Sequence, residues 1–338
     1  MLSDFTLCIS IKMRSPTVIG WLGVSAGFLA CSITAWVAYR KRHRKCRRSH
    51  KANEWQHLGT VKTINFYPLK GAAPIRLQQV DCSEYGFHTN GLWERCLVAY
   101  DKSDKLVYSG SYLRMLSIRV VILGERVLRL ESSNLPSPII IDLNDLLSDP
   151  SQIVEKLRIK VVTRLVECHV EHHEWLSRVV LQQEQGLRLY VKLKPLPHEA
   201  IDIFPVMVMH ERSVIDLNER LKEHSRPVDC QQFRRNLVID SKAGVQPYDE
   251  DNWFWLKIGE EIEHSIIMRY NSDCLRCILV NINVDDCTRN ADFEPFKTLN
   301  RFRIRTNPKE PTMGVYYDIY KLHLCSISAI NYLSQNFR

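Results

Sequence analysis

The sequence lacks the loops on which nucleotide-binding folds depend. No glycine-rich loop follows an expected strand, no Walker sequence occurs, and no internal repeat is present. Rossmann and P-loop proteins need such loops, because their backbone N–H groups hold the phosphates at the start of a helix. We therefore do not expect a nucleotide fold.

A disulfide framework and a cleavable-looking secretory signal are also missing. The chain has eleven cysteines, an odd number, scattered from Cys8 to Cys325 without regular spacing. Secreted domains that rely on disulfides carry even, patterned sets of cysteines. The pattern predicts free thiols in a reducing compartment.

Basic charge is in excess, but only in one place. The formal net charge is +8. Eight basic residues fall within residues 40–51, and the rest of the chain is close to neutral: Arg40, Lys41, Arg42, Arg44, Lys45, Arg47, Arg48 and Lys51. A nucleic-acid-binding domain would spread such charge over a face. Nucleic acid is therefore not an expected partner.

The segment before this basic run has the features of a membrane anchor. Residues 15–39 hold no charged side chain, and residues 18–39 are long enough for a helix that crosses a bilayer, which needs roughly 20 residues. A cleaved signal is the competing interpretation, but the basic cluster follows the apolar run instead of preceding it. We expect residues 1–51 to be a signal-anchor, with the rest of the chain in the cytosol by the positive-inside rule. The basic run could also bind anionic lipid headgroups.

Beyond the anchor, composition and pattern predict an α+β protein. The chain of 338 residues is 45% hydrophobic, which suits one large domain or two small ones. Helices are expected at residues 169–185 and 213–223, the latter with Ser213 as N-cap. Alternating apolar residues predict strands at residues 57–68, 76–80, 95–100, 105–108, 118–123, 127–131, 139–142 and 187–193. Many short strands with few helices indicate mixed or barrel-like β-sheets.

The pair Cys274 and Cys277, with Arg276 between them, is the most distinctive chemical feature. The apolar run that follows it predicts that a loop becomes a strand here. Such a pair can belong to a zinc site, to a redox dithiol, or to a site in which one thiolate binds a transition metal. A neighbouring cation favours the thiolate. Two ordinary buried cysteines are the fourth interpretation.

Two further clusters have both a structural and a functional interpretation. His169 and His173 stand four residues apart, the spacing that a metal can bridge, but a solvated helix N-terminus is the better interpretation because no third ligand is identifiable. Lys70, Arg95, Arg234 and Cys277 stand at strand ends, where loops converge on ligands. Arginine suits phosphate, although strand ends are also often simply exposed.

Residues 58–317 resemble the mitochondrial amidoxime-reducing component family, in which an N-terminal β-barrel-like region precedes a MOSC domain. The resemblance rests on these stretches: Tyr67-Pro68-Leu69-Lys70, Trp93-Glu94-Arg95, Asp216-Leu217-Asn218, Phe233-Arg234-Arg235-Asn236, Tyr248-x-Glu250-Asp251-x-Trp253, Cys274-Leu275-Arg276-Cys277, Glu294-Pro295 and Met313-Gly314-x-Tyr316. It implies a MOSC N-terminal domain at residues 55–180, a MOSC domain at residues 181–325 and a divergent tail at residues 326–338.

The resemblance also implies a cofactor and a reaction. Cys277 would be the catalytic metal ligand of a molybdenum cofactor (Mo-molybdopterin), and Cys274 a bystander. With no second cysteine pair in the chain, zinc and dithiol chemistry are then not expected. Five residues would bind the cofactor: Lys70, Arg95, Arg234, Asn236 and Arg276.

The implied reaction is the reduction of N-hydroxylated substrates with electrons from NADH through cytochrome b5 reductase and cytochrome b5. The implied location is the mitochondrial outer membrane, facing the cytosol, with the endoplasmic reticulum membrane as the alternative.

The sequence departs from the family where the cofactor would bind. Gly71-Ala72 replaces Ser-Cys, Tyr108-Ser109-Gly110 replaces Thr-x-Arg, Leu275 replaces a small polar residue, and Arg235 replaces proline. These changes favour a second hypothesis, a non-catalytic relative that serves as a membrane-tethered binding or scaffold protein. A third is a sulfur-carrier module that works beside a pyridoxal-phosphate desulfurase.

Overall fold

The computed structural model describes residues 55–83, 85–149, 151, 153–158, 161–193, 206–221, 226–259, 265–322, 326–328 and 332–336. Within these ranges, no helix is long and apolar enough to cross a membrane. The expected anchor at residues 18–39 and the basic run at residues 40–51 lie outside the described residues.

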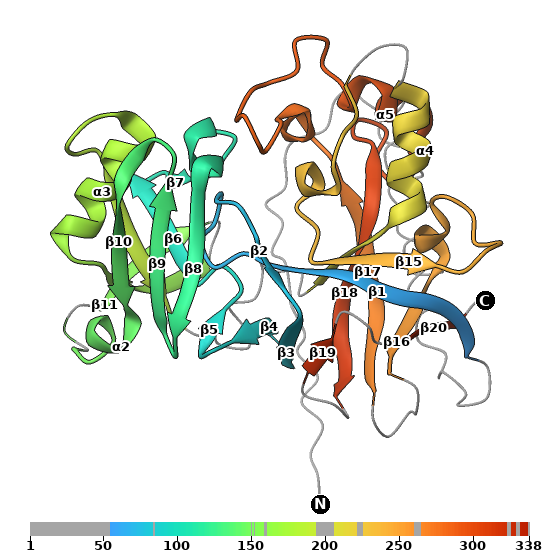
Figure 1. Ribbon diagram of the computed structural model, residues 1–338, viewed down its shortest axis with the longest axis horizontal. Coiled ribbons are helices and arrows are strands. Elements are labelled where there is room, and N and C mark those ends of the chain that lie inside the picture. Colours follow the sequence, from blue (N-terminus) through green and yellow to red (C-terminus); the bar gives the residue numbers. More distant parts are fainter. Residues whose placement is uncertain are drawn as a thin grey trace, which may run out of the picture. The chain divides into compact units, whose positions relative to one another are not determined.

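The largest sheet has eight strands, in the order β15-β14-β18-β17-β16-β20-β1-β2 (Figure 1). Their bounds are β1 Gln56–Phe66, β2 Ile75–Leu77, β14 Val206–His210, β15 Leu237–Ser241, β16 Trp255–Ile258, β17 Ile266–Leu275, β18 Thr312–Leu322 and β20 Tyr332–Asn336. The β14–β15 pair is parallel, whereas the other neighbours are antiparallel. Because β1 also pairs with β15, seven of these strands form a closed ring.

Within the described ranges, three smaller sheets accompany the large one. One has the order β10-β9-β8, with β8 Ile118–Gly124, β9 Val127–Ser132 and β10 Leu135–Asp142. The second has the order β11-β12-β13-β6-β7, with β6 Leu97–Asp101, β7 Leu106–Val107, β11 Ile153–Arg158, β12 Val161–Glu167 and β13 Leu187–Lys192. The third has the order β19-β3-β4-β5, with β3 Gln79–Ser83, β4 Gly86–Thr89, β5 Leu92–Trp93 and β19 Ser326–Ser328.

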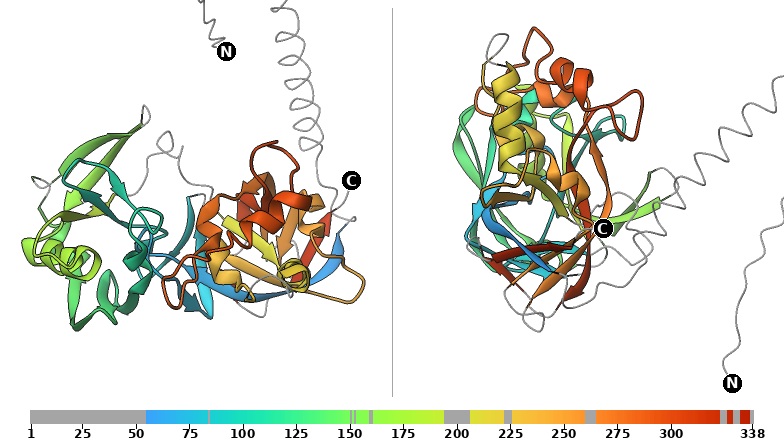
Figure 2. Two further views of the ribbon diagram at one scale, coloured as in Figure 1. Left: turned by 90° about the horizontal axis from the view of Figure 1, so that it is seen from above. Right: turned by 90° about the vertical axis from the view of Figure 1, so that its right-hand side faces the viewer.

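Helices are few, as the sequence predicts. The α-helices are α2 Leu143–Leu146, α3 Val170–Leu181, α4 Glu211–Leu221 and α5 Phe296–Phe302, and the 3₁₀ turns used below are η1 Leu113–Ser117, η4 Cys230–Phe233, η5 Asp249–Asn252 and η7 Ile278–Asn281. Helices α4 and α5 are in contact and lie at the same end of the large sheet in both Figure 1 and Figure 2. Mixed sheets with a few helices are therefore confirmed.

The large sheet surrounds a core that the alternating sequence explains. Strand β1 buries Val61 and Ile64, and the five residues of β14 are all buried. Met207 and Met209 of β14 pack with the apolar face of α4, which contributes Val214, Leu217 and Leu221. These burials hold the strand ends that form the site described below.

Most expected strands are present, with two differences at their margins. The strand expected at residues 76–80 is divided between β2 and β3. The residues expected to form a divergent tail join the sheets, because β19 pairs with β3 and β20 pairs with both β1 and β16. The eight-stranded sheet thus takes strands from both sides of the expected boundary at residue 180.

Two local predictions are wrong. Helix α4 begins at Glu211, so Ser213 lies inside the helix and is not its N-cap. The Ser213 hydroxyl instead donates to Glu250 and accepts from the Tyr248 backbone N–H. At the cysteine pair, strand β17 ends at Leu275 and the turn η7 follows, so the chain passes from strand to turn rather than from loop to strand.

Candidate functional site

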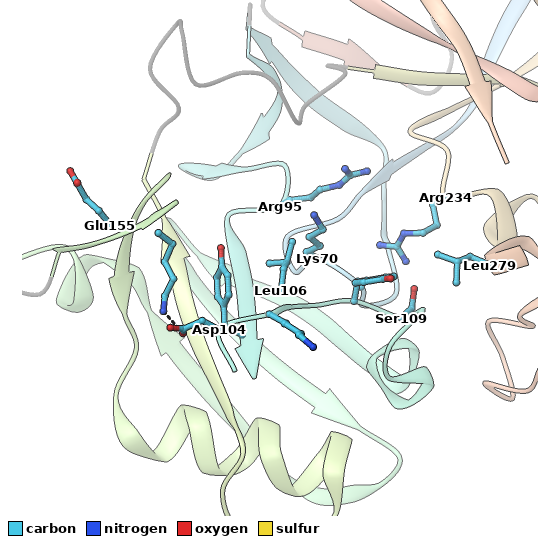
Figure 3. Close-up of a pocket in the computed structure, with 13 residues that line it drawn as sticks. Lys70, Arg95, Asp104, Leu106, Ser109, Glu155, Arg234 and Leu279 are labelled. Carbon is cyan, nitrogen blue, oxygen red and sulfur yellow. Dashed lines mark hydrogen bonds and ion pairs between the residues drawn. The ribbon is translucent and has the colours of Figure 1, made fainter. Parts of the chain in front are cut away.

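A cavity of about 720 Å³ brings together three of the predicted site residues (Figure 3). Its lining comes from strand ends and loops that are far apart in the sequence: Lys70, Gly71, Arg95, Tyr100, Asp104, Lys105, Leu106, Tyr108, Ser109, Glu155, Lys156, Arg234 and Leu279. Figure 3 shows Arg234 and Leu279 at the opposite end of this group from Asp104 and Glu155. Lys70, Arg95 and Arg234 therefore lie around one cavity, whereas Cys277, which was predicted to converge with them, is not among its lining residues.

Lys70 reaches the cavity because β1 stops at Phe66. Pro68 has no N–H for a sheet ladder, and the chain turns instead, with the Lys70 N–H donating to Leu97 O at 2.9 Å. Gly71 follows with a φ of 92°, and a Cβ there would lie 3.1 Å from both Ser109 N and Tyr108 Cα. Glycine permits this close approach of two loops at the cavity wall.

Arg95 is held by a buried carboxylate and by an uncommon backbone conformation. Its φ is 58°, in the left-handed region, and its N–H donates to Tyr67 O at 2.7 Å. Glu94 accepts from the Tyr67 N–H at 3.1 Å and lies 3.9 Å from Arg95 Nε. Burial raises the pKa of Glu94, and the neighbouring Arg95 partly offsets this. Glu94 thus joins the end of β1 to the cavity arginine.

Arg234 also has a left-handed backbone, with a φ of 50°. Its Nη1 donates to Ala72 O at 2.9 Å, and the guanidinium lies 4.5 Å from the centre of the Tyr67 ring. Burial lowers the pKa of Arg234, and the positive charge of Arg95 lowers it further. A bound anion would oppose both effects, because it would compensate the two positive charges.

The cavity as a whole is cationic. Five lysines and arginines line it, against two carboxylates, Asp104 and Glu155. Asp104 is already paired with Lys156 and with Arg188 Nη2, the latter at 2.7 Å. The positive end of the cavity, around Lys70, Arg95 and Arg234, is therefore suited to an anionic ligand.

Two other predicted cofactor residues do not line this cavity. Asn236 is buried, its Oδ1 accepts from the Met207 N–H, and its Nδ2 donates to Glu94 Oε1 at 3.2 Å. Arg276 is also buried and donates to the carbonyl oxygens of Phe233 and Met313. Both side chains bond to the protein itself, and they connect the loops around the site.

The two cysteines of the pair lie in different environments. Cys274 is buried in the core beside Val280, and the pKa of neighbouring Tyr316 is raised chiefly by burial and further by the Cys274 thiol. Cys277 is exposed at the start of η7, and Leu279, two residues later, lines the cavity. A redox dithiol needs two accessible sulfurs, so this asymmetry favours a single-thiolate role.

The histidines of α3 have structural partners. His169 Nε2 lies 2.8 Å from Asp145 Oδ2, His172 Nε2 lies 3.0 Å from Ile140 O, and His173 Nδ1 accepts from the Leu189 N–H. Over the described residues, no group of three or more His, Cys, Asp or Glu side chains could hold a metal ion.

The donor set fits a phosphorylated organic cofactor better than a bare metal ion. One exposed thiol can supply a single soft ligand, whereas a protein-bound metal ion needs several ligands from the chain. The three cations suit a phosphate. A molybdenum cofactor carries its own sulfur ligands to the metal, so one cysteine and a cationic cavity are the contribution required of the chain.

Several lining residues were not singled out from the sequence. Tyr100, Asp104, Lys105 and Leu106 come from the β6–β7 hairpin, which was predicted without a role. Leu279 belongs to the run that was misassigned as a strand. The position of this hairpin at the cavity depends on contacts between residues that are distant in sequence. No local sequence pattern indicates such contacts.

The chain is similar to several known proteins. The model of the family described as MOSC domain matches residues 196–326. Mitochondrial amidoxime reducing component 2 of Rattus norvegicus is 23% identical over 324 residues, which cover 89% of this chain and 90% of that protein. Mitochondrial amidoxime-reducing component 1 of Homo sapiens is 26% identical over 323 residues, 88% of each chain. The relative of that name in Danio rerio is 26% identical over 284 residues, 78% of this chain and 81% of its own.

The matched domain contains Arg234 and the cysteine pair. The alignments with the Rattus norvegicus and Homo sapiens proteins cover 89% and 88% of this chain. The chain therefore contains a MOSC domain and is a divergent relative of the proteins named mitochondrial amidoxime-reducing components.

Proposed function

We propose that this protein is a molybdenum-cofactor oxidoreductase that reduces N-hydroxylated substrates. The observation that carries the proposal is the convergence of Lys70, Arg95 and Arg234 in one cationic cavity, next to the turn that bears Cys277. The names of the relatives support the reaction class. Overall, the N-hydroxyl substrate takes up two electrons and two protons and yields the N–H product and water.

Each residue has a separate task in this proposal. Arg95 and Arg234 bind the cofactor phosphate through their N–H groups, and Lys70 adds a third positive charge. Cys277 supplies the soft thiolate ligand. Glu94 and Asn236, bonded to each other at 3.2 Å, fix the strand ends from which these side chains project. The cofactor, when bound, supplies the two-electron exchange.

The electron donors and the location extend the proposal. Electrons would come from NADH through cytochrome b5 reductase and cytochrome b5. The chain would be anchored by residues 18–39 in the mitochondrial outer membrane and face the cytosol. The names of the relatives support only the mitochondrial part of this location.

Reduction of benzamidoxime by the cofactor-loaded full chain tests the activity. With NADH, cytochrome b5 reductase and cytochrome b5 present, we expect benzamidine to form at a rate that falls at least tenfold in Arg234→Met. The matched control is Arg119→Met, an exposed arginine of β8 that does not line the cavity. Lack of any product with the loaded wild-type chain would contradict the proposal.

A second function, a non-catalytic tethered binding protein, is favoured by one observation. Tyr108 lines the cavity and Leu275 is exposed between the cysteines, and both stand where the family has smaller polar residues. This function predicts a chain that binds the cofactor, or another anion, in the cavity without turnover.

A further inference from the structure

We use the name apolar rim for Tyr108 and Leu279, which line the cationic cavity, and for Leu275 and Ile278, which lie within four residues of Leu279 in the chain. Of these, Tyr108 is 41% exposed, Leu275 42% and Ile278 49%. Large exposed side chains are unremarkable when scattered, but a group of them beside a cavity marks a ligand surface. The apolar rim is not needed for an anion to bind at Lys70, Arg95 and Arg234.

Two residues of the rim flank Cys277, the predicted metal ligand, in the chain. Leu275 and Ile278 are two and one residues from Cys277, so their Cα atoms lie within about 8 Å of it, because consecutive Cα atoms are 3.8 Å apart. Leu275 ends β17 and Ile278 begins η7. Both side chains are thus exposed on either side of the exposed thiol.

The aromatic part of the rim is fixed in place from the other side. A Cβ added to Gly110 would meet the Tyr108 ring and would lie 2.7 Å from Leu279 Cδ2. The Tyr108 ring and the Leu279 side chain therefore both pack on Gly110. Arg289 Nη2 donates to Gly110 O at 3.1 Å, which ties this loop to the segment after η7. Tyr108 is consequently held next to the residues that follow Cys277.

We propose that the rim binds the apolar body of the N-hydroxylated substrate, and that Tyr108 makes the protein prefer aromatic over small polar N-hydroxy compounds. The inference rests on the proposed function. An aryl group that enters the cavity mouth would stack on or against the edge of the Tyr108 ring, while Leu275 and Ile278 remove it from water. Contacts of this kind change specificity by roughly 10- to 200-fold.

The experiment compares two substrates that carry the same N-hydroxyl group. The cofactor-loaded full chain is titrated calorimetrically with benzamidoxime and with hydroxyurea, and kcat and KM are measured for both. Tyr108→Thr and Leu275→Ser remove the rim, and Tyr108→Phe keeps the ring. Matched controls are Tyr320→Thr and Leu123→Ser, which change residues of 54% and 45% exposure that do not line the cavity.

We expect Tyr108→Thr to weaken benzamidoxime binding at least tenfold, through Kd and KM, and to weaken hydroxyurea binding less. Leu275→Ser should act in the same direction, and Tyr108→Phe and both controls should resemble the wild type. If Tyr108→Thr binds benzamidoxime with an unchanged Kd and the protein still turns the substrate over, the proposal for the rim is wrong and the proposed function stands. If the wild type binds benzamidoxime through the rim but does not reduce it, the proposed function is refuted and the rim remains a binding surface for the compound. Absence of both binding and turnover overturns both proposals.

Discussion

Arg95 and Arg234, the two arginines of the cationic cavity, have backbone conformations that residues with a side chain rarely adopt. Their φ angles are 58° and 50°. The left-handed region costs an L-residue about 1–2 kcal/mol, so such positions persist where the surrounding contacts impose them. Here the Tyr67 carbonyl fixes Arg95, and the end of η4 fixes Arg234. The strain coincides with the cavity.

Replacing Arg95 with glycine removes the positive charge but keeps a residue that tolerates the left-handed backbone conformation, so the effects of charge and backbone can be measured separately. We expect Arg95→Gly to change the free energy of unfolding by less than about 1 kcal/mol, because relief of the left-handed φ offsets the loss of the Glu94 ion pair. Cofactor retention should fall at least tenfold. Arg126 has the same φ of 58° but is exposed outside the cavity, so Arg126→Gly is the control and should retain the cofactor. Urea unfolding and gel-filtered cofactor content measure the two effects; equal retention by both variants would argue against the phosphate role of Arg95.

At the scale of elements, closure of the large sheet depends on one glycine. Gly59 pairs with Ser241 between β1 and β15, and a Cβ there would collide with Asp240 O and lie 2.7 Å from Ser241 Cα. We expect Gly59→Ala to cost about 2–4 kcal/mol, measured by urea unfolding, because the strands would have to separate. Gly244→Ala is the control for a glycine with open space around its Cβ position, although its φ of 95° predicts a smaller loss of about 1 kcal/mol. Equal losses would contradict the close approach of β1 and β15.

A buried pair between β14 and η5 gives the fold a characteristic pH dependence. His210 and Glu250 are fully buried, with His210 Nδ1 3.9 Å from Glu250 Oε2. Burial, and then the nearby Asp251, raise the pKa of Glu250 to about 7, whereas burial lowers the pKa of His210 to about 4. The stability linked to Glu250 is full below the ordinary carboxyl pKa of 4.5 and is lost as the pH rises through 7. That linked to His210 is full above its ordinary 6.5 and is lost as the pH falls through 4.

The two effects oppose each other between pH 4.5 and 6.5. Glu250→Gln removes one of them, so its free energy of unfolding should fall more steeply than that of the wild type as the pH is lowered from 6.5 to 4. We expect the difference between the two proteins to change by on the order of 1–3 kcal/mol over this interval. Urea unfolding at several pH values measures it. Parallel curves would show that Glu250 titrates as an ordinary carboxyl.

The strands were predictable from sequence because a period of two in apolar residues marks a half-buried strand. Strand β9 follows that rule, with Leu128 and Leu130 buried, whereas β6 is a continuous apolar run whose first four residues are all buried. For the run Ile278-Leu279-Val280 the rule gave a wrong prediction. Three β-branched or apolar residues predict a strand, but these residues form the turn η7, in which Ile278 is exposed and Val280 is buried. A short apolar run carries no period long enough to distinguish a strand from a 3₁₀ turn.

The candidate site was predictable only as far as its charges. Lys70, Arg95 and Arg234 could be chosen because strand ends carry functional side chains. Asn236 and Arg276 are also polar residues near strand ends, yet they bond to buried carbonyl and amide groups within the protein. The partner that a polar side chain finds depends on the tertiary fold, and no local pattern in the sequence specifies it.

At the scale of the whole molecule, the cavity brings together three regions of sequence, around residues 70, 95 and 234. A cofactor bound there should stabilise the native state by mass action, since the unfolded chain has no such cavity. We expect the cofactor-free full chain to melt several degrees below the loaded chain in calorimetry. The difference should shrink in Arg95→Gly and stay unchanged in Arg126→Gly. Identical melting temperatures for loaded and free wild type would place the cofactor elsewhere or nowhere.

Molybdenum content of the purified full chain tests the central claim most directly. Measured by inductively coupled plasma mass spectrometry after expression in cells that make the cofactor, the wild type should contain about one molybdenum atom per chain. Cys277→Ala should lose it, and Cys274→Ala should keep it at a cost of about 1–2 kcal/mol in stability, because its thiol is buried in the core. A wild-type chain without molybdenum, or equal molybdenum in the wild type and Cys277→Ala, would contradict the account.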